Sequence, residues 1–326
     1  MVYFIFCLPS NLFPAVYSKL LLDRNGQLLE ARIAEDGQWR FPQIDSVPPK
    51  YEQCVLRYED QHFRIHPGVN PLAILRAIYL NIKAGKTVSG GSTITMQTVR
   101  LMRKNGDRTV FEKLIEIIWA VRLECSYSKN EILQLYATQA PYGGNVVGLE
   151  TAAWRYFNRA PSQLSWAESA MLAVLPNAPG LIHLNKNRNA LLDKRNKLLK
   201  DLVEDDYISK EAYSIAIDEP LPNPINSLPH HAYHLVNRFE SDANRINSTI
   251  EIKLQKQFNA ITANYGAELQ RQNIHNLSAV LLEVETGEVL AYVGNLFRDN
   301  DLHAGKVDML KSVRSSGSIL KPLLYA

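Results

Sequence analysis

The chain has 326 residues and a formal net charge of +3, so it is long enough for two domains and too weakly charged to indicate nucleic-acid binding. Apolar residues make up 46% and charged residues 21%, a balance typical of globular proteins that argues against disorder. The cysteines Cys7, Cys54 and Cys125 are far apart and form no Cys-x-x-Cys pair, which argues against a disulfide framework or a zinc site.

The first eight residues are all apolar, whereas a membrane-spanning helix needs about 20 such residues. No basic segment precedes this run and no small-residue cleavage site follows it, so a signal peptide is not indicated. Two interpretations stay open: a buried strand, or the end of a membrane helix that begins outside this sequence. We expect residues 1–13 to be the remnant of a membrane anchor.

A β-rich lead-in is predicted over residues 14–44. The pair Asn25-Gly26 is a strong signal for a tight turn, and β-rich runs flank it at Val16–Leu22 and Leu28–Ile33. We therefore expect a two-stranded hairpin ahead of the helical region.

Residues 45–218 are expected to form a mainly α domain. One helix is predicted to begin after the N-cap residue Asn70, with Pro71 at its first position, and to end at Gly85. Apolar residues recur within it at helical spacing, and we expect most of them to lie in the core rather than on a surface that dips into a membrane. These residues are Leu75, Ile78, Tyr79 and Ile82.

Further helices in this region have clear starts. Ser128 with Glu131, and Ser165 with Glu168, have the spacing of capping boxes, in which two side chains satisfy free N–H groups at a helix start. A later helix has one stripe made of Leu191, Arg195, Leu198 and Leu202.

The pattern changes after residue 218. Four prolines between Glu219 and Pro229 indicate a linker, to which we assign residues 219–245. Thr286-Gly287 then separates two β-rich runs, Ser278–Val284 and Glu288–Val293, and predicts a second hairpin. We expect residues 246–326 to begin an α/β domain that is too short for a complete catalytic domain.

The first segment with chemical potential is Glu59–Gly68. Two adjacent carboxylates, Glu59 and Asp60, raise each other's pKa when partly buried, which suits acid–base catalysis, although such a pair is more often a solvated surface feature. His62 and His66 are four apart, but Pro67 and Gly68 end any helix there, which argues against zinc.

Three other segments carry candidate residues. Ser89–Gln97 contains a Gly-Gly turn and small hydroxyl side chains; it lacks the pattern of a Walker A loop, and on residue types alone a surface loop that caps a helix is favoured. Arg108–Glu116 places Lys113 and Glu116 three residues apart, on one helix face, as in an ordinary surface ion pair or a phosphate site. Ser318 and Lys321 form a Ser-x-x-Lys pair, in which a lysine can activate a serine nucleophile, although such a pair often occurs by chance.

Taken in order, these segments resemble glycosyltransferase family 51. The family's Glu-Asp-x-x-Phe-x-x-His-x-Gly pattern is carried by Glu59–Gly68, and its Gly-Gly-Ser-Thr-Ile-Thr-x-Gln pattern by Gly90–Gln97. An Arg-Lys-x-x-Glu-type helix that ends in Leu-Glu follows. The fourth and fifth patterns depart from the family: Ala140–Asn145 stands where many members have Asn-x-x-Tyr-Leu-Gly, with Leu172–Pro179 after it.

The resemblance implies a lysozyme-like glycosyltransferase domain whose substrate is lipid II, a disaccharide-pentapeptide on undecaprenyl pyrophosphate. Glu59 would be the general base, and Glu116 a second catalytic carboxylate that holds Lys113 or a metal, or assists the acceptor. Substrate contacts would come from Asp60, Ser92, Thr93, Gln97, Arg108 and Lys113. A divalent cation, magnesium or manganese, is an expected cofactor, although no ligand set for it is evident.

The family members that this chain resembles are bifunctional class A penicillin-binding proteins, in which a transpeptidase domain follows. Ser318 would be the nucleophile position and Lys321 its base, with Ser316 in place of the usual proline. No Ser-x-Asn or Lys-Thr-Gly element follows, so we expect a truncated transpeptidase start without activity and without acylation by β-lactams.

The resemblance also implies partners and a location. Lipid II, the growing glycan chain and the membrane surface are the expected partners, other cell-wall synthesis proteins are further candidates, and nucleic acid is not expected. The location would be the periplasmic face of the inner membrane. Two alternatives stay open: a lysozyme-like lytic enzyme that cuts finished glycan, and a scaffold without catalysis.

Overall fold

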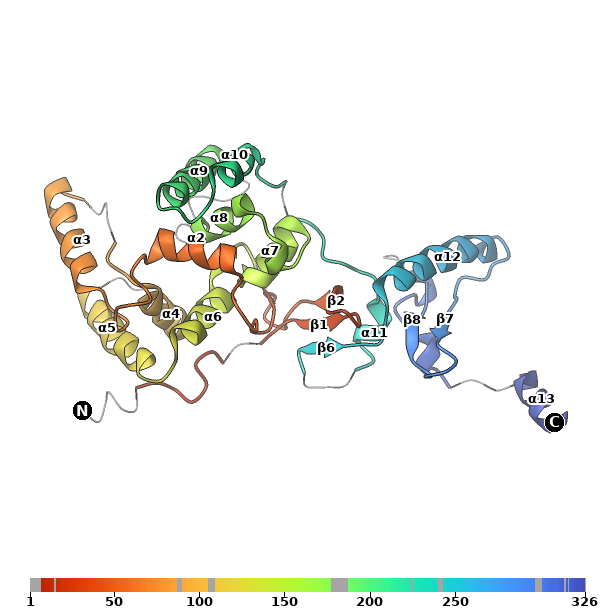
Figure 1. Cartoon of the computed structure of the whole chain (residues 1–326). Helices are drawn as coiled ribbons and strands as arrows, with labels where there is room; N and C mark the ends of the chain where they lie inside the picture. Colours follow the sequence, from red (N-terminus) through yellow and green to blue (C-terminus); the bar gives the residue numbers. More distant parts are fainter. Residues whose placement is uncertain are drawn as a thin grey trace. The chain divides into compact units, whose positions relative to one another are not determined.

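The computed structural model describes residues 7–14, 16–86, 90–104, 109–176, 187–223, 225–239, 243–296, 301–313, 315 and 317–325 (Figure 1). The chain divides into two compact units. The first comprises Met1–Ser18 and Ile33–Leu228, and the second comprises Lys19–Arg32 and Pro229–Ala326. The hairpin that we expected as a lead-in thus belongs to the second unit.

The first unit is mainly α-helical, as predicted. A small sheet accompanies the helices, in the order β3-β5-β4. Its strands are β3 (Trp39–Arg40), β4 (Pro141–Gly143) and β5 (Val146–Val147). The helices are α2 (Pro49–Glu59), α3 (Pro71–Ala84), α4 (Ile94–Arg103), α5 (Val110–Glu124), α6 (Lys129–Gln139), α7 (Leu149–Phe157), α8 (Trp166–Val174), α9 (Arg188–Glu204) and α10 (Lys210–Asp218), with a 3-10 turn η1 at Pro161–Gln163.

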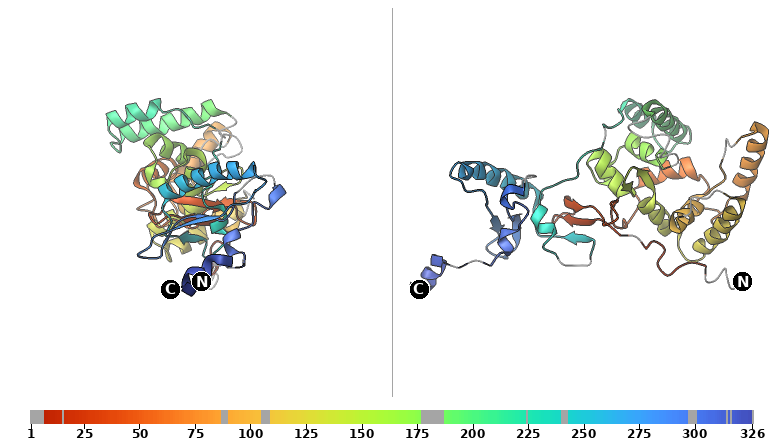
Figure 2. Two further views of the ribbon diagram at one scale, coloured as in Figure 1. Left: turned by 90° about the vertical axis from the view of Figure 1, so that its right-hand side faces the viewer. Right: turned by 180° about the vertical axis from the view of Figure 1, so that it is seen from behind.

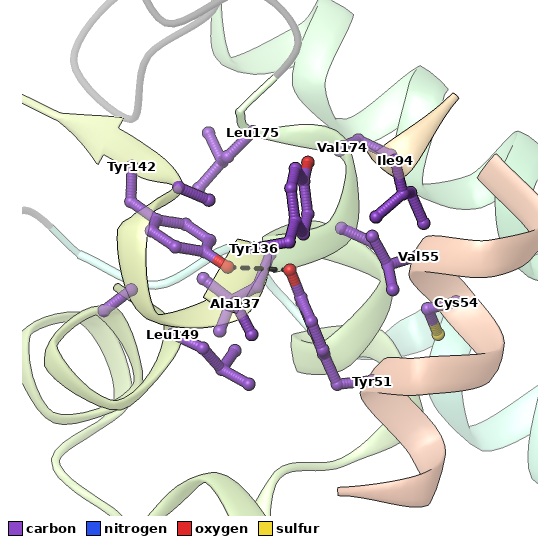
Figure 3. Packing of buried hydrophobic residues seen from close by; sticks show 14 of the residues in the cluster. Tyr51, Cys54, Val55, Ile94, Tyr136, Ala137, Tyr142, Leu149, Val174 and Leu175 are labelled. Atoms are coloured by element: carbon purple, nitrogen blue, oxygen red, sulfur yellow. Dashed lines mark hydrogen bonds between the residues drawn. The ribbon is translucent and has the colours of Figure 1, made fainter. Parts of the chain in front are cut away.

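The core of the first unit forms where α2, α4, α6 and α8 meet (Figure 3). Tyr51 of α2 and Tyr142 of β4 are fully buried, and their hydroxyls hydrogen-bond to each other at 2.8 Å. This bond satisfies two polar groups that would otherwise be costly to bury. The core therefore fixes the direction of α2, which carries Glu59 at its last position.

The predicted helix ends are confirmed. Both capping boxes form, at Ser128 with Glu131 and at Ser165 with Glu168. The Asn70 side chain accepts a hydrogen bond from the Ala73 N–H at the start of α3. The predicted stripe of α9 is buried and includes Arg195, which hydrogen-bonds to the carbonyls of residues 217 and 219.

The prediction that the apolar face of α3 lies in the core is wrong. Leu75 is 63% exposed, Ile78 51%, Tyr79 63% and Ile82 76%, and Ala77 is the buried residue of this helix. In Figures 1 and 2, α3 extends away from the other helices of its unit. Helical periodicity shows that an apolar face exists, but it does not show what covers that face.

The second unit contains both predicted hairpins. β1 (Lys19–Leu22) and β2 (Leu28–Arg32) pair antiparallel, as do β7 (Ala279–Leu282) and β8 (Val289–Val293). β6 (Arg245–Asn247) pairs parallel to β1, and this long-range pairing ties residues 19–32 to the second unit. Figure 2 shows the β7–β8 hairpin beside α12. The remaining elements are α11 (Tyr233–Val236), α12 (Ile252–Gln270), η2 (Asp301–His303), η3 (Met309–Lys311), η4 (Gly317–Leu320) and α13 (Lys321–Tyr325).

Among the helices that the structure describes, none has the length and apolar composition to cross a bilayer. The expected anchor remnant at residues 1–13 lies partly outside the described residues, because residues 1–6 are not among them.

Gly68 allows the loop that follows α2 to approach α5 closely. A Cβ atom at Gly68 would lie 2.7 Å from the Ala120 carbonyl oxygen, and the backbone has φ +88°. Gly68→Ala should therefore lower the free energy of unfolding by about 2–3 kcal/mol, measured by urea denaturation. Gly85→Ala is the control, since Gly85 has φ +62° and open space around it, and should cost about 1 kcal/mol. If the two variants lost the same free energy of unfolding, the close approach at Gly68 would not be what makes the glycine necessary.

Candidate active site

Glu59 presents a partly buried carboxylate at the C-terminal end of α2. Its Oε2 accepts a hydrogen bond of 2.7 Å from Gln97 Nε2 of α4. Its Oε1 is buried and has no hydrogen-bond partner among the described residues. Two of the predicted site residues thus contact each other, and one oxygen of Glu59 is left to accept a proton.

Burial raises the pKa of Glu59, and the negative charge of Asp60 raises it further. The hydrogen bond from Gln97 and the positive charge of Lys194 oppose this rise in pKa without cancelling it. The end of a helix also carries partial negative charge, which disfavours a carboxylate there. A carboxylate with a raised pKa is a better proton acceptor at neutral pH than an ordinary surface glutamate.

Asp60 is buried and engaged inside the protein. Both of its carboxylate oxygens lie within 3.0 Å of His66 Nε2, and Oδ2 also accepts the Ile94 N–H at 3.1 Å. That N–H belongs to the first residue of α4, where a helix favours negative charge. This geometry favours a positioning role for Asp60 over the substrate contact that we expected from the sequence.

Thr93 is also engaged internally. It is 2% exposed, its Oγ1 accepts the Met96 N–H at 3.1 Å as the N-cap of α4, and its hydroxyl donates to the Gly68 carbonyl at 2.6 Å. The loop before it lies close to α3, because a Cβ atom at Gly91 would lie 2.8 Å from the Ile74 Cα. The segment therefore caps a helix, as the residue types alone suggested, and the glycine is required by packing.

Lys113 and Glu116 share one face of α5, as predicted. Lys113 Nζ donates to the Ser92 hydroxyl and to Glu116 Oε2, the latter at 3.2 Å. Arg100 of α4 binds both oxygens of Glu116, at 2.6 and 2.9 Å. Ser92, Lys113 and Glu116 are thus brought together, with two cations around one buried carboxylate.

The pKa of Glu116 shifts in the opposite direction to that of Glu59. Burial alone would raise it, but the hydrogen bond from Arg100 and the charges of Lys113 and Arg100 hold the pKa of Glu116 below its usual value. The lowered pKa favours Glu116 as an anion that holds two cations in place, and makes it a poorer proton acceptor than Glu59.

Sequence reasoning missed Arg100. The available signal was its spacing, because Arg100 follows Gln97 by three residues and so lies on the same face of a helix. Gln97 binds Glu59 and Arg100 binds Glu116, so this one face of α4 contacts both carboxylates.

These residues match a known family. The model of the family described as transglycosylase matches residues 25–203, more than half of the chain. The chain belongs to the transglycosylase family.

Several relatives of this transglycosylase are penicillin-binding proteins. The chain is 33% identical over 312 residues to penicillin-binding protein 1C of Escherichia coli, and the match covers 94% of this chain and 40% of the relative. Penicillin-binding protein 1B of Haemophilus influenzae is 31% identical over 304 residues, covering 86% of this chain and 38% of the relative. A crystal structure of penicillin-binding protein 1A from the same organism has a TM-score of 0.36 at 20% identity, covering 73% of this chain and 27% of that one. The chain thus spans about two fifths of the curated relatives' length.

Three of the predicted residues remain to be located: Arg108, Ser318 and Lys321. Arg108 lies outside the described residues. Ser318, in η4, and Lys321, at the start of α13, belong to the second unit and are exposed, and the structure's described parts show no hydrogen bond between them.

The site does not fit a divalent cation held by the protein. Both oxygens of Glu116 already accept from Arg100 and Lys113. Across the described residues, no three His, Cys, Asp or Glu side chains are grouped so as to hold a metal ion. The expected magnesium or manganese therefore has no ligand set here, and we assign it no step.

Replacing each carboxylate by its amide should change stability in opposite directions. The pKa of Glu59 is raised, so the wild type should lose stability relative to Glu59→Gln as pH rises from the unfolded-state pKa through the folded-state pKa. The pKa of Glu116 is lowered, so Glu116→Gln should be roughly 1–3 kcal/mol less stable than wild type near neutral pH. That loss should vanish as pH falls through the folded-state pKa. Thermal unfolding of wild type and both variants, from acid to neutral pH, measures these two changes in stability. If both variants were stabilised, or both destabilised, at neutral pH, the opposite pKa shifts of Glu59 and Glu116 would be contradicted.

Proposed function

We propose that this transglycosylase polymerises lipid II into glycan strands with loss of undecaprenyl pyrophosphate. The observation that carries the proposal is the arrangement on α4. Gln97 orients the proton-accepting Glu59, and Arg100, one helical turn further on, holds the carboxylate that organises Lys113. Three residues of helix span about 4.5 Å, so a base and a cation cluster lie within reach of one sugar-pyrophosphate linkage.

The reaction requires one base and one site for negative charge. The Glu59 carboxylate takes the proton from the 4-hydroxyl of the acceptor sugar, and the oxygen of that hydroxyl attacks the anomeric carbon of the growing chain. The bond from this carbon to the pyrophosphate breaks, its electron pair leaves with the pyrophosphate oxygen, and the configuration inverts. Lys113, together with Arg108 of the same segment, offsets the charge that develops on the leaving group.

Glu116 and Asp60 act through other residues in this proposal. Glu116 fixes Lys113 and Arg100, and Asp60 fixes the junction from which Glu59 projects. Ser92 is half-buried beside Lys113, so its hydroxyl is placed to contact a phosphate oxygen or a sugar hydroxyl. Thr93 acts by capping α4.

We further propose that the exposed face of α3 contacts the membrane in which lipid II resides. Leu72, Leu75 and Ile82 are each more than 60% exposed. Such a large exposed apolar face is unusual on a helix that functions in water, and it is typical of a membrane or protein interface. This contact supports a location at the periplasmic face of the inner membrane, with other cell-wall synthesis proteins as further candidate partners.

Two alternative functions make different predictions. A lytic enzyme would also use a glutamate in a helical domain, but it would cleave finished glycan and ignore lipid II. A scaffold would have no turnover. Arg100 and Lys113 place two positive charges around the single carboxylate of Glu116, and this excess of positive charge supports the handling of a pyrophosphate, which only the polymerase needs.

Glu59→Gln should reduce lipid II polymerisation by about 10²–10⁴-fold, because the amide cannot accept the proton. Glu52→Gln is the control, since Glu52 lies in the first turn of the same helix. Polymerisation and glycan cleavage should be assayed side by side, with and without moenomycin, the family's usual inhibitor. Polymerisation that survives Glu59→Gln would disprove the role of Glu59, and cleavage without polymerisation would favour the lytic alternative.

Lys113→Met should lower kcat for polymerisation by about 10²-fold, because charge on the leaving pyrophosphate would lose its nearest cation. Arg103→Met is the matched control, since Arg103 joins the same two helices through Glu112. Steady-state kinetics with lipid II should show a small effect for Arg103→Met. An equal loss of kcat in both variants would indicate that helix packing, rather than charge at the site, was disturbed.

A further inference from the structure

A cavity of about 450 Å³ lies between the loop that follows α2 and the first two turns of α3. Neither Glu59 nor Lys113 lines it. Most of its lining is apolar and includes Leu72, and the lining also contains Arg76, His62 and His66. An apolar cavity with a few charged groups suits an amphipathic ligand.

The lining of this cavity includes Arg76 and no carboxylate, while the carboxylate of Asp60 bonds the lining residue His66. Residues 61–86 contain two arginines and two lysines and no aspartate or glutamate. Arg64 is occupied by Glu52 and Asn130. Arg76 is exposed and, within the described ranges, has neither an ion pair nor a side-chain hydrogen bond. An exposed guanidinium at the edge of an apolar cavity fits a phosphodiester, which it can bind through two hydrogen bonds.

A second, independent feature is the buried His66, which is 8% exposed and lines the same cavity. Its Nε2 hydrogen-bonds to Asp60, while its Nδ1 has no partner among the residues described. With Nε2 donating to a carboxylate, Nδ1 of a neutral imidazole is an acceptor. Because this Nδ1 is itself buried, the groups that face a ligand are Arg76 and the apolar lining.

The exposed apolar face of α3 begins at this cavity. Leu72 lines the cavity and is 78% exposed, and Leu75 and Tyr79 follow at helical spacing. A phospholipid held by its headgroup at Arg76 would therefore have its acyl chains beside an apolar surface. Charge complementarity and this continuity together favour one occupant, an anionic phospholipid.

We propose that this cavity binds the phosphodiester headgroup of an anionic membrane phospholipid, with Arg76 as the main ligand and His62 beside it. The proposal rests on the membrane contact of α3 proposed above. It adds that this contact selects anionic lipid, which places the active site of the transglycosylase on anionic regions of the membrane.

The test is co-sedimentation of the full chain with phosphatidylcholine vesicles, with and without phosphatidylglycerol. Each basic residue near an anionic surface contributes about five-fold to binding without specific contact. Arg76→Gln should therefore lose more than about ten-fold in binding to the anionic vesicles, and the control Lys83→Gln, on the same helix but outside the cavity, about five-fold. His62→Gln is a second variant in the cavity, should Arg76→Gln fail to fold.

Each outcome decides between the two proposals. Equal losses for Arg76→Gln and Lys83→Gln would overturn the headgroup site and indicate non-specific attraction. Equal binding of wild type to neutral and anionic vesicles would also overturn it while leaving the membrane contact of α3 intact. If the wild type bound neither neutral nor anionic vesicles, both the headgroup site and the membrane contact of α3 would be overturned. Competition by inorganic phosphate at low concentration would show a site for free phosphate instead of lipid.

Discussion

The junction between the end of α2 and the start of α4 depends on one buried carboxylate. Asp60 accepts the Ile94 N–H at the positive end of α4 and binds His66, so it joins two helices and the loop between them. Glu59, the preceding residue, cannot move independently of this junction. The same charge raises the pKa of Glu59, because two carboxylates at adjacent positions repel each other. Asp60 therefore fixes where the proposed base lies and, after burial, adds to the rise in its pKa, without requiring any contact with substrate.

Two glutamates of one site thus differ in chemistry because their neighbours differ. Glu59 faces one neutral amide and keeps an unpaired oxygen, whereas Glu116 faces two cations that occupy both of its oxygens. Environments that move two pKa values apart are the usual way in which a site separates a proton acceptor from a structural anion. One face of α4 produces this difference, since Gln97 and Arg100 are a single turn apart.

Local features were predictable from the sequence, and partners across space were not. Helix caps such as Ser128 with Glu131, and turns such as Asn25-Gly26, depend on residues close in sequence, and the structure confirms them. The exposure of α3 and the pairing of β1 with β6 depend on what lies beside an element, which periodicity does not encode. The structure brings Glu59 to Gln97, and Ser92 to Lys113 and Glu116. The internal contacts of Asp60 were not foreseen, since a sequence pattern does not separate a ligand contact from a positioning contact. The helix cap at Thr93, in contrast, was the interpretation that the residue types favoured.

The buried, unpaired Oε1 of Glu59 has a cost to stability, because a buried acceptor without a hydrogen bond typically costs about 1–3 kcal/mol. A core selected for stability alone would pair this oxygen or replace the residue. Tyr136, whose buried hydroxyl also lacks a partner within the described structure, belongs to the same surroundings, since the charge of Glu59 helps to raise the pKa of Tyr136 after burial itself. Unsatisfied polar groups concentrate at functional sites, where a partner is supplied by substrate. The acceptor hydroxyl of a sugar is such a partner, so the feature that weakens the fold at Glu59 is the one that the proposed reaction requires.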